Sequence, residues 1–206
     1  MNYLIRRYTP TGDILDETPV FKKIKYVRTT NSVGGLELQL PLNYETTDFG
    51  NNQIIEIWEN GKLIEDTAYF LKKWTFEEDA DENQKITLFG FDANWLLATR
   101  IVWEYAGSAG ADMTDYADDM AKEIFDDAFT DGGTDRFIEY LSLQAQIGAA
   151  PSISKAFAYQ NVLSVIQDIA DISASEGTRL YFDMVRTGIG TFEFRTFINQ
   201  RGKYLR

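Results

Sequence analysis

Hydrophobic and polar residues alternate strictly in part of the first half of the chain. Leu36, Leu38 and Leu40 alternate with two polar residues, and a proline follows directly. A period of two is typical of a β-strand with one buried face. Further strands are predicted at residues 2–8, 20–30, 53–59, 62–77 and 84–90. Several of them carry apolar residues on both faces, which indicates that a partner covers the second face.

Turn residues separate these strands. Residues 10–13 (Pro-Thr-Gly-Asp) form a predicted turn, and the pair Asn60-Gly61 favours a tight hairpin between the strands on either side of it. An acidic loop at residues 78–83 precedes the last strand of the series. A meander of this length commonly curls on itself, so we predict a small N-terminal β-barrel.

The hydrophobic period changes after residue 92. Asp92 is a candidate cap for a short helix over residues 92–97, and a linker rich in Gly and Ala follows at 106–111. Residues 112–129 have the spacing of an amphipathic helix that ends at Gly132-Gly133. Its apolar face comprises Met113, Ala117, Met120, Ala121, Ile124, Phe125 and Ala128. Its predicted solvated face comprises Asp115, Asp118, Asp119, Lys122, Glu123, Asp126 and Asp127.

A third helix is predicted over residues 161–175, with Gly177 as its left-handed exit. A hairpin of residues 179–186 and 191–198 follows. The predicted fold class is therefore α+β: an N-terminal small β-barrel in residues 1–105, and an α/β subdomain with helices packed on a short sheet in residues 106–206.

Composition removes many kinds of chemistry. The 206 residues include no Cys and no His, which excludes disulfides, thiol nucleophiles, Cys- or His-based zinc sites and imidazole-dependent triads. The formal charge of −12 opposes binding to nucleic acid through phosphate contacts and to anionic membranes. No apolar run reaches the ~18 residues of a membrane span, and no secretion signal is recognisable, so we expect synthesis in a cytoplasm without a membrane anchor.

Two acidic patterns are candidates for chemistry. Asp79, Asp81 and Asn83 match the first ligands of a calcium loop, but Gln84 and Gly90 stand where the loop needs glycine and glutamate. A solvated hairpin loop is therefore favoured. The acidic face of the helix at 112–129 could supply paired carboxylates for glycoside hydrolysis, although a charged outer surface is the favoured interpretation.

The other candidate residues have structural interpretations. Ser108, in the linker, lacks the glycine pattern of a nucleophile elbow. Four tryptophans are expected to pack in the core with satisfied indole N–H groups, although one or two could anchor a subunit contact: Trp58, Trp74, Trp95 and Trp103. Arg100 is expected to form a salt bridge that locks its helix to the barrel. No catalytic, cofactor-binding or metal-binding residue is predicted, no cofactor is expected, and the chain is predicted not to be an enzyme.

Several segments taken in order resemble the tail hub (baseplate hub) proteins of long-tailed bacteriophages. They are residues 36–41 (LELQLP), 55–58 (IEIW), 73–76 (KWTF), 90–92 (GFD), 96–102 (LLATRIV), 117–120 (ADDM), 157–163 (FAYQNVL), 180–183 (LYFD) and 192–196 (FEFRT). Their specificity lies in their order along the chain. Hub chains usually continue with a further β domain, so the resemblance implies either a minimal hub or a fragment.

The resemblance implies a structural component of the tail tip in the virion. Such a hub is a ring, usually a homotrimer, that caps or extends the tail tube and guides DNA or tape-measure protein through its channel. The implied partners are further copies of the chain, tail tube or distal tail ring proteins, the tape-measure protein, and DNA in transit. The open alternatives are a carbohydrate-binding or adhesin-like β module and a glycoside hydrolase that works without histidine.

Overall fold

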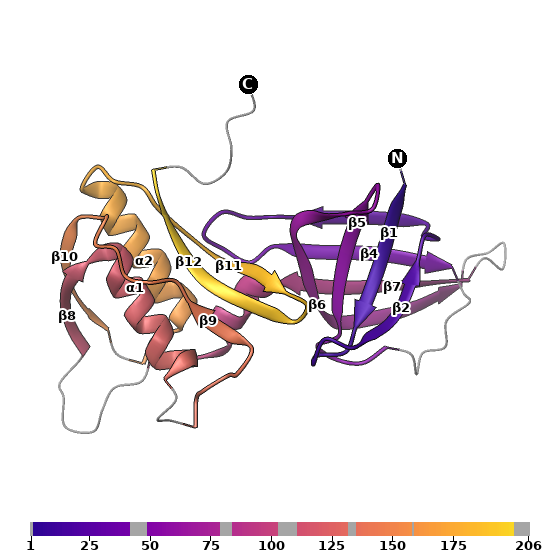
Figure 1. Ribbon diagram of the computed structural model, residues 1–206, viewed down its shortest axis with the longest axis horizontal. Helices are drawn as coiled ribbons and strands as arrows, with labels where there is room; N and C mark the ends of the chain where they lie inside the picture. Colours follow the sequence, from indigo (N-terminus) through magenta and orange to yellow (C-terminus); the bar gives the residue numbers. More distant parts are fainter. Residues whose placement is uncertain are drawn as a thin grey trace. The chain divides into compact units, whose positions relative to one another are not determined.

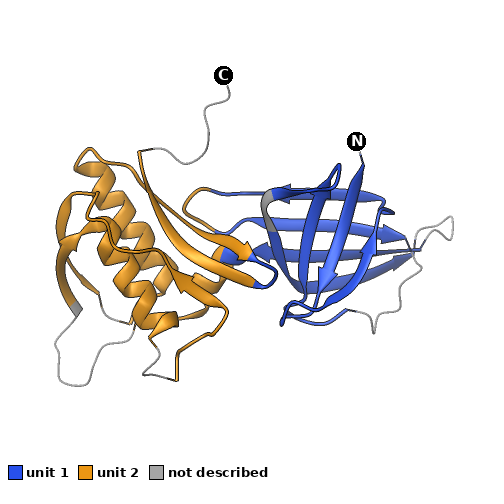
Figure 2. Cartoon of the chain, in the orientation of Figure 1, with its two compact units in different colours: residues 1–29, 33–93, 188–190 blue, residues 30–32, 94–187, 191–206 orange. Residues whose placement is uncertain are grey.

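The chain forms two compact units in a computed structural model that describes residues 2–41, 49–78, 84–102, 111–131, 135–157 and 159–199. Unit 1 consists of residues 1–29, 33–93 and 188–190 (Figure 2). Unit 2 consists of residues 30–32, 94–187 and 191–206. The division of the sequence into domains 1–105 and 106–206 stays a prediction.

Unit 1 is a seven-stranded antiparallel sheet in the order β2-β1-β5-β6-β7-β4-β3 (Figure 1). Its strands are β1 (Tyr3–Tyr8), β2 (Ile14–Thr18), β3 (Lys23–Val27), β4 (Gly35–Pro41), β5 (Ile54–Glu59), β6 (Lys62–Glu78) and β7 (Gln84–Asp92). Asn60 and Gly61 have φ angles of 50° and 79°, the left-handed pair of the predicted hairpin turn between β5 and β6.

The inner face of this sheet is the apolar core of unit 1. Strand β4 alternates as predicted: its three leucines are buried, and Leu38 lies opposite Leu88 of β7 with both side chains fully buried. The buried members of the core are Ile5, Leu36, Leu38, Leu40, Phe49, Ile55, Ile57, Tyr69, Leu71, Ile86 and Leu88. Each such side chain contributes about 1.5–3 kcal/mol through burial, so the alternation fixes which face turns inward.

The sheet of unit 1 is open, and the predicted barrel is wrong. The two end strands, β2 and β3, are consecutive in sequence but are not hydrogen-bonded to each other. Groups in the connecting segment cannot close the seam: Pro19 has no N–H, the Val20 N–H donates to Thr18 Oγ1 (3.1 Å), and the Lys22 N–H donates to Gln39 O (2.7 Å). The single predicted strand at 20–30 is also replaced by the shorter strand β3.

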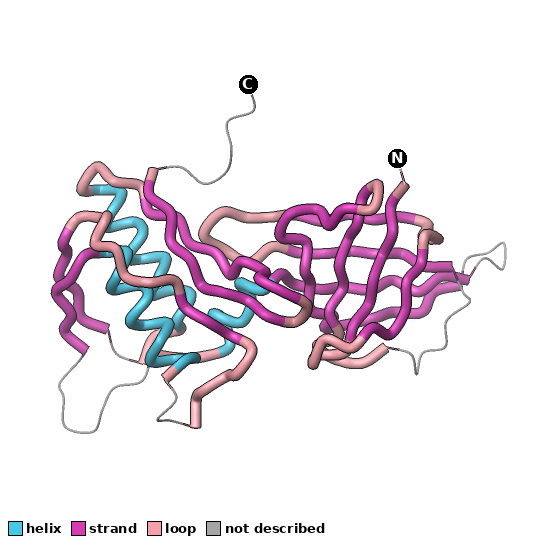
Figure 3. The backbone as a smooth tube through the Cα atoms, in the orientation of Figure 1, coloured by secondary structure: helices cyan, strands magenta, loops and turns pink. Residues whose placement is uncertain are grey.

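Unit 2 places two α-helices between two small sheets (Figures 1 and 3). Its elements are η2 (Ala93–Thr99, a 3₁₀-helix), β8 (Ala111–Tyr116), α1 (Ala117–Phe125), η3 (Asp126–Thr130, a π-helical turn), β9 (Leu141–Leu143), β10 (Ser152–Phe157), α2 (Val162–Ser175), β11 (Leu180–Gly188) and β12 (Thr191–Ile198). One sheet pairs β10 with β8, and the other has the order β11-β12-β9.

These sheets overturn the predicted fold class as a whole. The described residues are mostly antiparallel strand in open sheets, with short helices, rather than a small barrel followed by an α/β subdomain. No helix in the described part of the chain is long and apolar enough to cross a membrane.

The predicted helix at residues 112–129 is also wrong at its start. Residues 111–116 form strand β8, which pairs with β10 from Ala111↔Phe157 to Tyr116↔Ser152. Accessibility alternates along Asp112–Tyr116, which is the period of a strand. Only Ala117–Phe125 is α-helical, because the backbone N–H groups before Ala117 bond across to β10 instead of along the chain.

The prediction for the third helix is confirmed. Asn161 is the N-cap of α2, and its side chain accepts a hydrogen bond from the Ser164 N–H (3.4 Å). Gly177 has φ +89°, as expected for a left-handed helix exit. Between α1 and β12, Phe125 stacks on both Phe129 and Phe194, with ring centroids 5.0 and 4.7 Å apart.

Candidate functional site

The outer face of the unit 1 sheet carries an apolar groove. Cross-strand register aligns Val27, Gly35 and Phe91, and the next row aligns Lys25, Glu37 and Phe89. Since β7 alternates inward and outward, Leu88 is fully buried while Phe89 and Phe91 are 37% and 43% exposed. The face away from the core therefore presents large apolar side chains to solvent.

The groove exists because glycine occupies its floor. Gly35 lies in the outward row of Val27 and Phe91 and has no side chain, so a hollow of ≈ 310 Å³ opens between the aromatic rings of β7 and the side chains of β3. Lys25 and Glu37 supply charge at its rim. A hydrogen bond from Lys23 lowers the pKa of Glu37, so its carboxylate stays ionised at neutral pH. Such a groove can accept apolar side chains of a partner.

A buried carboxylate lies elsewhere on the same sheet. Glu56 is fully buried, and its Oε2 accepts hydrogen bonds from the Tyr8 hydroxyl (3.0 Å) and the Trp58 indole N–H (3.1 Å). The Arg6 guanidinium lies 3.9 Å from the centroid of the Trp58 ring. Burial, and secondarily Glu56, raise the pKa of Tyr8, so its hydroxyl remains a donor.

The tryptophan predictions have separate outcomes. A satisfied indole is confirmed for Trp58, and Trp74 packs against the core of unit 1. Trp95 is half-buried in η2. Trp103 lies outside the described residues.

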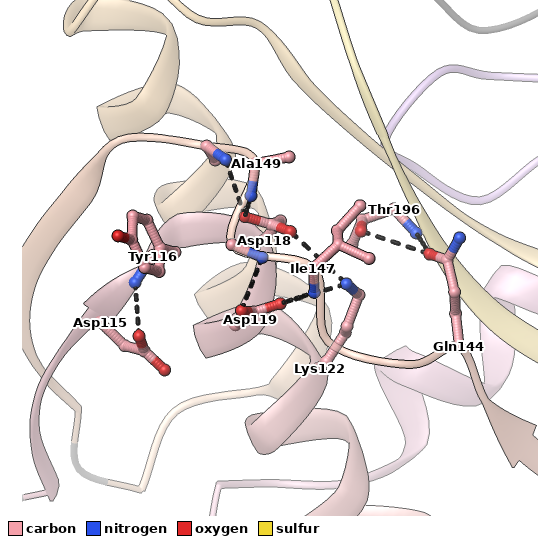
Figure 4. A network of polar contacts seen from close by, with 11 residues as sticks. Asp115, Tyr116, Asp118, Asp119, Lys122, Gln144, Ile147, Ala149 and Thr196 are labelled. Carbon is pink, nitrogen blue, oxygen red and sulfur yellow. Dashed lines mark hydrogen bonds and ion pairs between the residues drawn. The ribbon is translucent and has the colours of Figure 1, made fainter.

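The main polar network of unit 2 lies at the start of α1 (Figure 4). Asp118 Oδ1 accepts hydrogen bonds from the N–H groups of Ala149 (3.0 Å) and Ala150 (2.8 Å). Asp119 accepts one from Ile147 on Oδ1 (2.9 Å) and one from Gly148 on Oδ2 (2.8 Å). Two neighbouring carboxylates thus satisfy four consecutive backbone N–H groups of one loop.

Lys122 neutralises part of this charge. Its Nζ lies 3.2 Å from Asp119 Oδ1 and 3.5 Å from Asp118 Oδ2, and the Lys122 side chain is fully buried. Charges are stable in such a place only when they are paired and hydrogen-bonded. The loop at 147–150 is therefore fastened to the helix by side chains rather than by a backbone ladder.

This network corrects the prediction of a solvated acidic face. Asp118, Asp119 and Lys122 were expected in solvent and are instead buried. The oxygens of both carboxylates already accept hydrogen bonds, so these two groups are not poised as an acid and a base on a bound sugar. Sequence reasoning missed them because the loop that covers them lies 28 to 32 residues further along the chain.

Two other acidic residues of the region lie in solvent, whereas Asp115 and Asp126 are half-buried. Glu123 and Asp127 are exposed as predicted. Burial and neighbouring carboxylates raise the pKa of both groups: Asp127, Asp115 and Asp126 act on Glu123, and Asp126 and Asp131 act on Asp127. No group of three or more acidic side chains suited to a metal ion occurs within the described residues.

Arg100 has different partners from those predicted. Its Nη1 donates to the carbonyl oxygens of Ala128 and Arg136, and its guanidinium lies 5.0 Å from the centroid of the Phe129 ring. The expected salt bridge to the N-terminal module is thus replaced by contacts inside unit 2. The calcium-like residues 79–83 and the linker with Ser108 lie outside the described residues.

Comparisons with known proteins find a match among solved structures. Neither protein-family models nor curated protein sequences give a match. Two solved structures are similar over 94% of this chain. One is the tail protein from Neisseria meningitidis MC58, with 14% identity and a TM-score of 0.54. The other is the 43 kDa tail protein of prophage MuSo2 from Shewanella oneidensis, with 11% identity and a TM-score of 0.52.

The chain shares the fold of these tail proteins. It covers 50% and 52% of the two neighbours, so it spans about half the length of the structures that it matches. At this level of identity the likeness concerns the fold and not individual residues.

Proposed function

We propose that this chain is a structural component of a phage tail. The observation that carries the proposal is the similarity of 94% of the chain to two tail proteins, one of them from a prophage. A structural role also agrees with the exposed apolar groove of unit 1, since patches of this kind mark interaction surfaces. The proposed role is non-enzymatic, and the proposed location is the virion tail.

The finer proposal is a hub ring at the tail tip. Copies of the chain, three in the proposed form, assemble into a ring that caps or extends the tail tube, and DNA or tape-measure protein passes through it. The net charge of −12 supports this role, because an acidic channel wall does not retain DNA. Its proposed partners are tail tube or distal tail ring proteins and the tape-measure protein.

The test is the mass and shape of the purified full chain. Light scattering behind size-exclusion chromatography should give a mass of three chains at high protein concentration, and electron microscopy should show rings. A single-chain mass over the whole concentration range would refute the ring.

A second candidate function is carbohydrate binding. One observation favours it: Phe89 and Phe91 expose aromatic rings on one face, and sugar rings stack on such platforms. Titration with host-surface oligosaccharides, followed by intrinsic fluorescence, tests it. The double variant Phe89→Ala/Phe91→Ala should abolish any signal, and a signal unchanged in that variant would exclude this face.

A further inference from the structure

The open sheet of unit 1 ends in two strands of opposite charge. β2 and β3 are the end strands, and within the described residues each is paired on one side only. The acidic side chains at the β2 edge are Asp13, Asp16 and Glu17, and the basic side chains at the β3 edge are Lys22, Lys23 and Lys25. No residue of opposite charge interrupts either series. The two edges are therefore complementary to each other and not to themselves.

Both edges also expose apolar side chains. Ile14 and Leu15 on β2 are 58% and 43% exposed, and Val27 on β3 is 50% exposed. Val27 lies at the end of the strand that lines the apolar groove described above. An apolar, unpaired strand edge favours pairing with another strand, and proteins normally protect such edges.

Some of this charge is already paired inside the sheet. Glu17 Oε1 forms an ion pair with Arg6 Nε at 2.5 Å. Asp16 Oδ2 forms an ion pair with Arg7 Nη2 at 2.8 Å. Lys23 lies 2.8 Å from Glu37. The Arg7 side chain is buried and bonds Asp16 through two nitrogens, so the Asp16 charge is satisfied within the sheet. The Glu17 and Lys23 pairs are partly exposed and contribute about 0–1 kcal/mol each. No ion pair among the described residues involves Asp13, Lys22 or Lys25, and these three residues keep the opposite signs of the two edges.

The sign of each edge restricts what can bind there. Lysines on an edge strand repel an identical edge, which disfavours a symmetric contact of β3 with β3. The same argument disfavours β2 with β2. An edge of opposite sign is attracted, and charge complementarity of this kind fixes partner and register.

We propose that the β2 edge of one copy of this chain docks against the β3 edge of the next copy. This inference rests on the proposed function, and it names the surfaces that join the ring. Because two different surfaces meet, the contact is head-to-tail, and it closes into the proposed ring when the rotation from one copy to the next is a whole fraction of a turn. Leu15 of one copy then lies near Val27 of its neighbour, beside the apolar groove.

Because the chain contains no cysteine, an introduced cysteine is the only thiol that a crosslinker can modify. Leu15→Cys and Val27→Cys replace exposed residues and should leave the fold intact. Each single variant alone, and an equal mixture of the two, is treated with a short thiol-specific crosslinker at a concentration where the chain self-associates. The mixture should give a covalent two-chain species, and each single variant alone should give none.

Crosslinking of the double variant Leu15→Cys/Val27→Cys also measures the number of copies in the ring. It should give a ladder that stops at the number of chains in the ring. Leu15→Cys mixed with Ile147→Cys is the control, because Ile147 is 58% exposed on unit 2 and belongs to neither edge. This control mixture should give no crosslinked species.

The outcomes separate this inference from the proposed function. If the chain self-associates but the Leu15→Cys and Val27→Cys mixture does not crosslink, the edge contact is refuted and the ring survives. Crosslinking of either single variant with itself would show a symmetric contact and would also refute the inference. A chain that is monomeric throughout would refute both.

A charge exchange provides an independent measurement. Lys25→Glu alone or Glu17→Lys alone should weaken self-association at least tenfold, since each places like charges across the contact. The double variant carries both exchanges and should recover most of the lost association. Equal weakening by the double variant and the single variants would refute the electrostatic match.

Discussion

The outer face of the unit 1 sheet and the start of α1 in unit 2 differ in which side chains they bury. Unit 1 has an apolar inner face and also leaves Phe89, Phe91 and Val27 exposed on its outer face. Unit 2 does the reverse at the start of α1, where two carboxylates and a lysine are buried. Unit 2 uses these charges internally to hold a loop, whereas the outer face of unit 1 leaves two aromatic rings in solvent, which agrees with the partner surface proposed above.

Loss of one charge should therefore damage unit 2 most. Asp118→Ala leaves the N–H groups of Ala149 and Ala150 without their acceptor and Lys122 with one partner fewer. We expect a loss of about 3–5 kcal/mol in the free energy of unfolding, measured with urea. Amide hydrogen exchange at residues 149 and 150 should also become faster.

The matched control is Glu123→Gln on the exposed side of the same helix. This variant should change the free energy of unfolding by no more than about 0.5 kcal/mol. A loss below about 1 kcal/mol in Asp118→Ala would show that the buried network contributes little and would remove the contrast between the units.

Gly90→Ala should have the next largest effect on the free energy of unfolding, because glycine allows two strands to lie close together there. A Cβ on Gly90 would lie 2.9 Å from Phe70 O of the adjacent strand β6, so Gly90→Ala forces two strands apart. We expect a loss of about 1–3 kcal/mol, measured by urea unfolding. Gly35→Ala is the control, because its Cβ would meet nothing closer than Gly90 O at 3.8 Å. Equal losses in both variants would contradict the close approach.

Lys72 connects the stability of unit 1 to pH. Burial lowers the pKa of its ammonium from 10.5 to about 8. Between about pH 8 and pH 10.5 the unfolded chain holds a proton that the folded chain has lost, so stability should rise with pH in this window. Because the side chain is partly exposed, we expect a rise of about 1 kcal/mol.

Urea unfolding at several pH values measures this rise. Lys72→Met should abolish it, whereas Lys73→Met, at the neighbouring exposed position, should retain it. A rise of equal size in both variants would assign the pH dependence to other groups.

The smallest effect on stability is expected at the outer face. Phe91→Ser should change the free energy of unfolding by about 0.5 kcal/mol, since the ring is 43% exposed, yet it should weaken self-association. Leu88→Ala, on the inward side of the same strand, should lose about 2–5 kcal/mol. Unfolding and light scattering on the same samples separate the two effects. Unchanged association in Phe91→Ser would mean that this ring faces no partner.

Local patterns predicted the elements whose environment is itself local. The alternation of Leu36, Leu38 and Leu40, the turn at Asn60-Gly61 and the cap at Asn161 all occur as expected. Each of these signals is contained within a few neighbouring residues, where propensity and side-chain period act directly. The hairpin of β11 and β12 follows the same rule.

The failures concern contacts between distant segments. The barrel required pairing of β2 with β3, and Pro19 was the one local signal against it. The start of the helix predicted at 112–129 became a strand because β10, about 40 residues later, pairs with it. The closely spaced Asp118, Asp119 and Lys122 were a possible sign of a buried network, but the same spacing is common on exposed helices.

The sequence alone therefore determined the inward face of β4, the limits of α2, and the absence of cysteine and histidine chemistry. Only the tertiary structure decided that the sheet stays open, that three charged residues of α1 are buried, and that two phenylalanines of β7 remain exposed. The physical reason is that side-chain period fixes which residues share a face, whereas the cover of that face comes from segments far away in the chain.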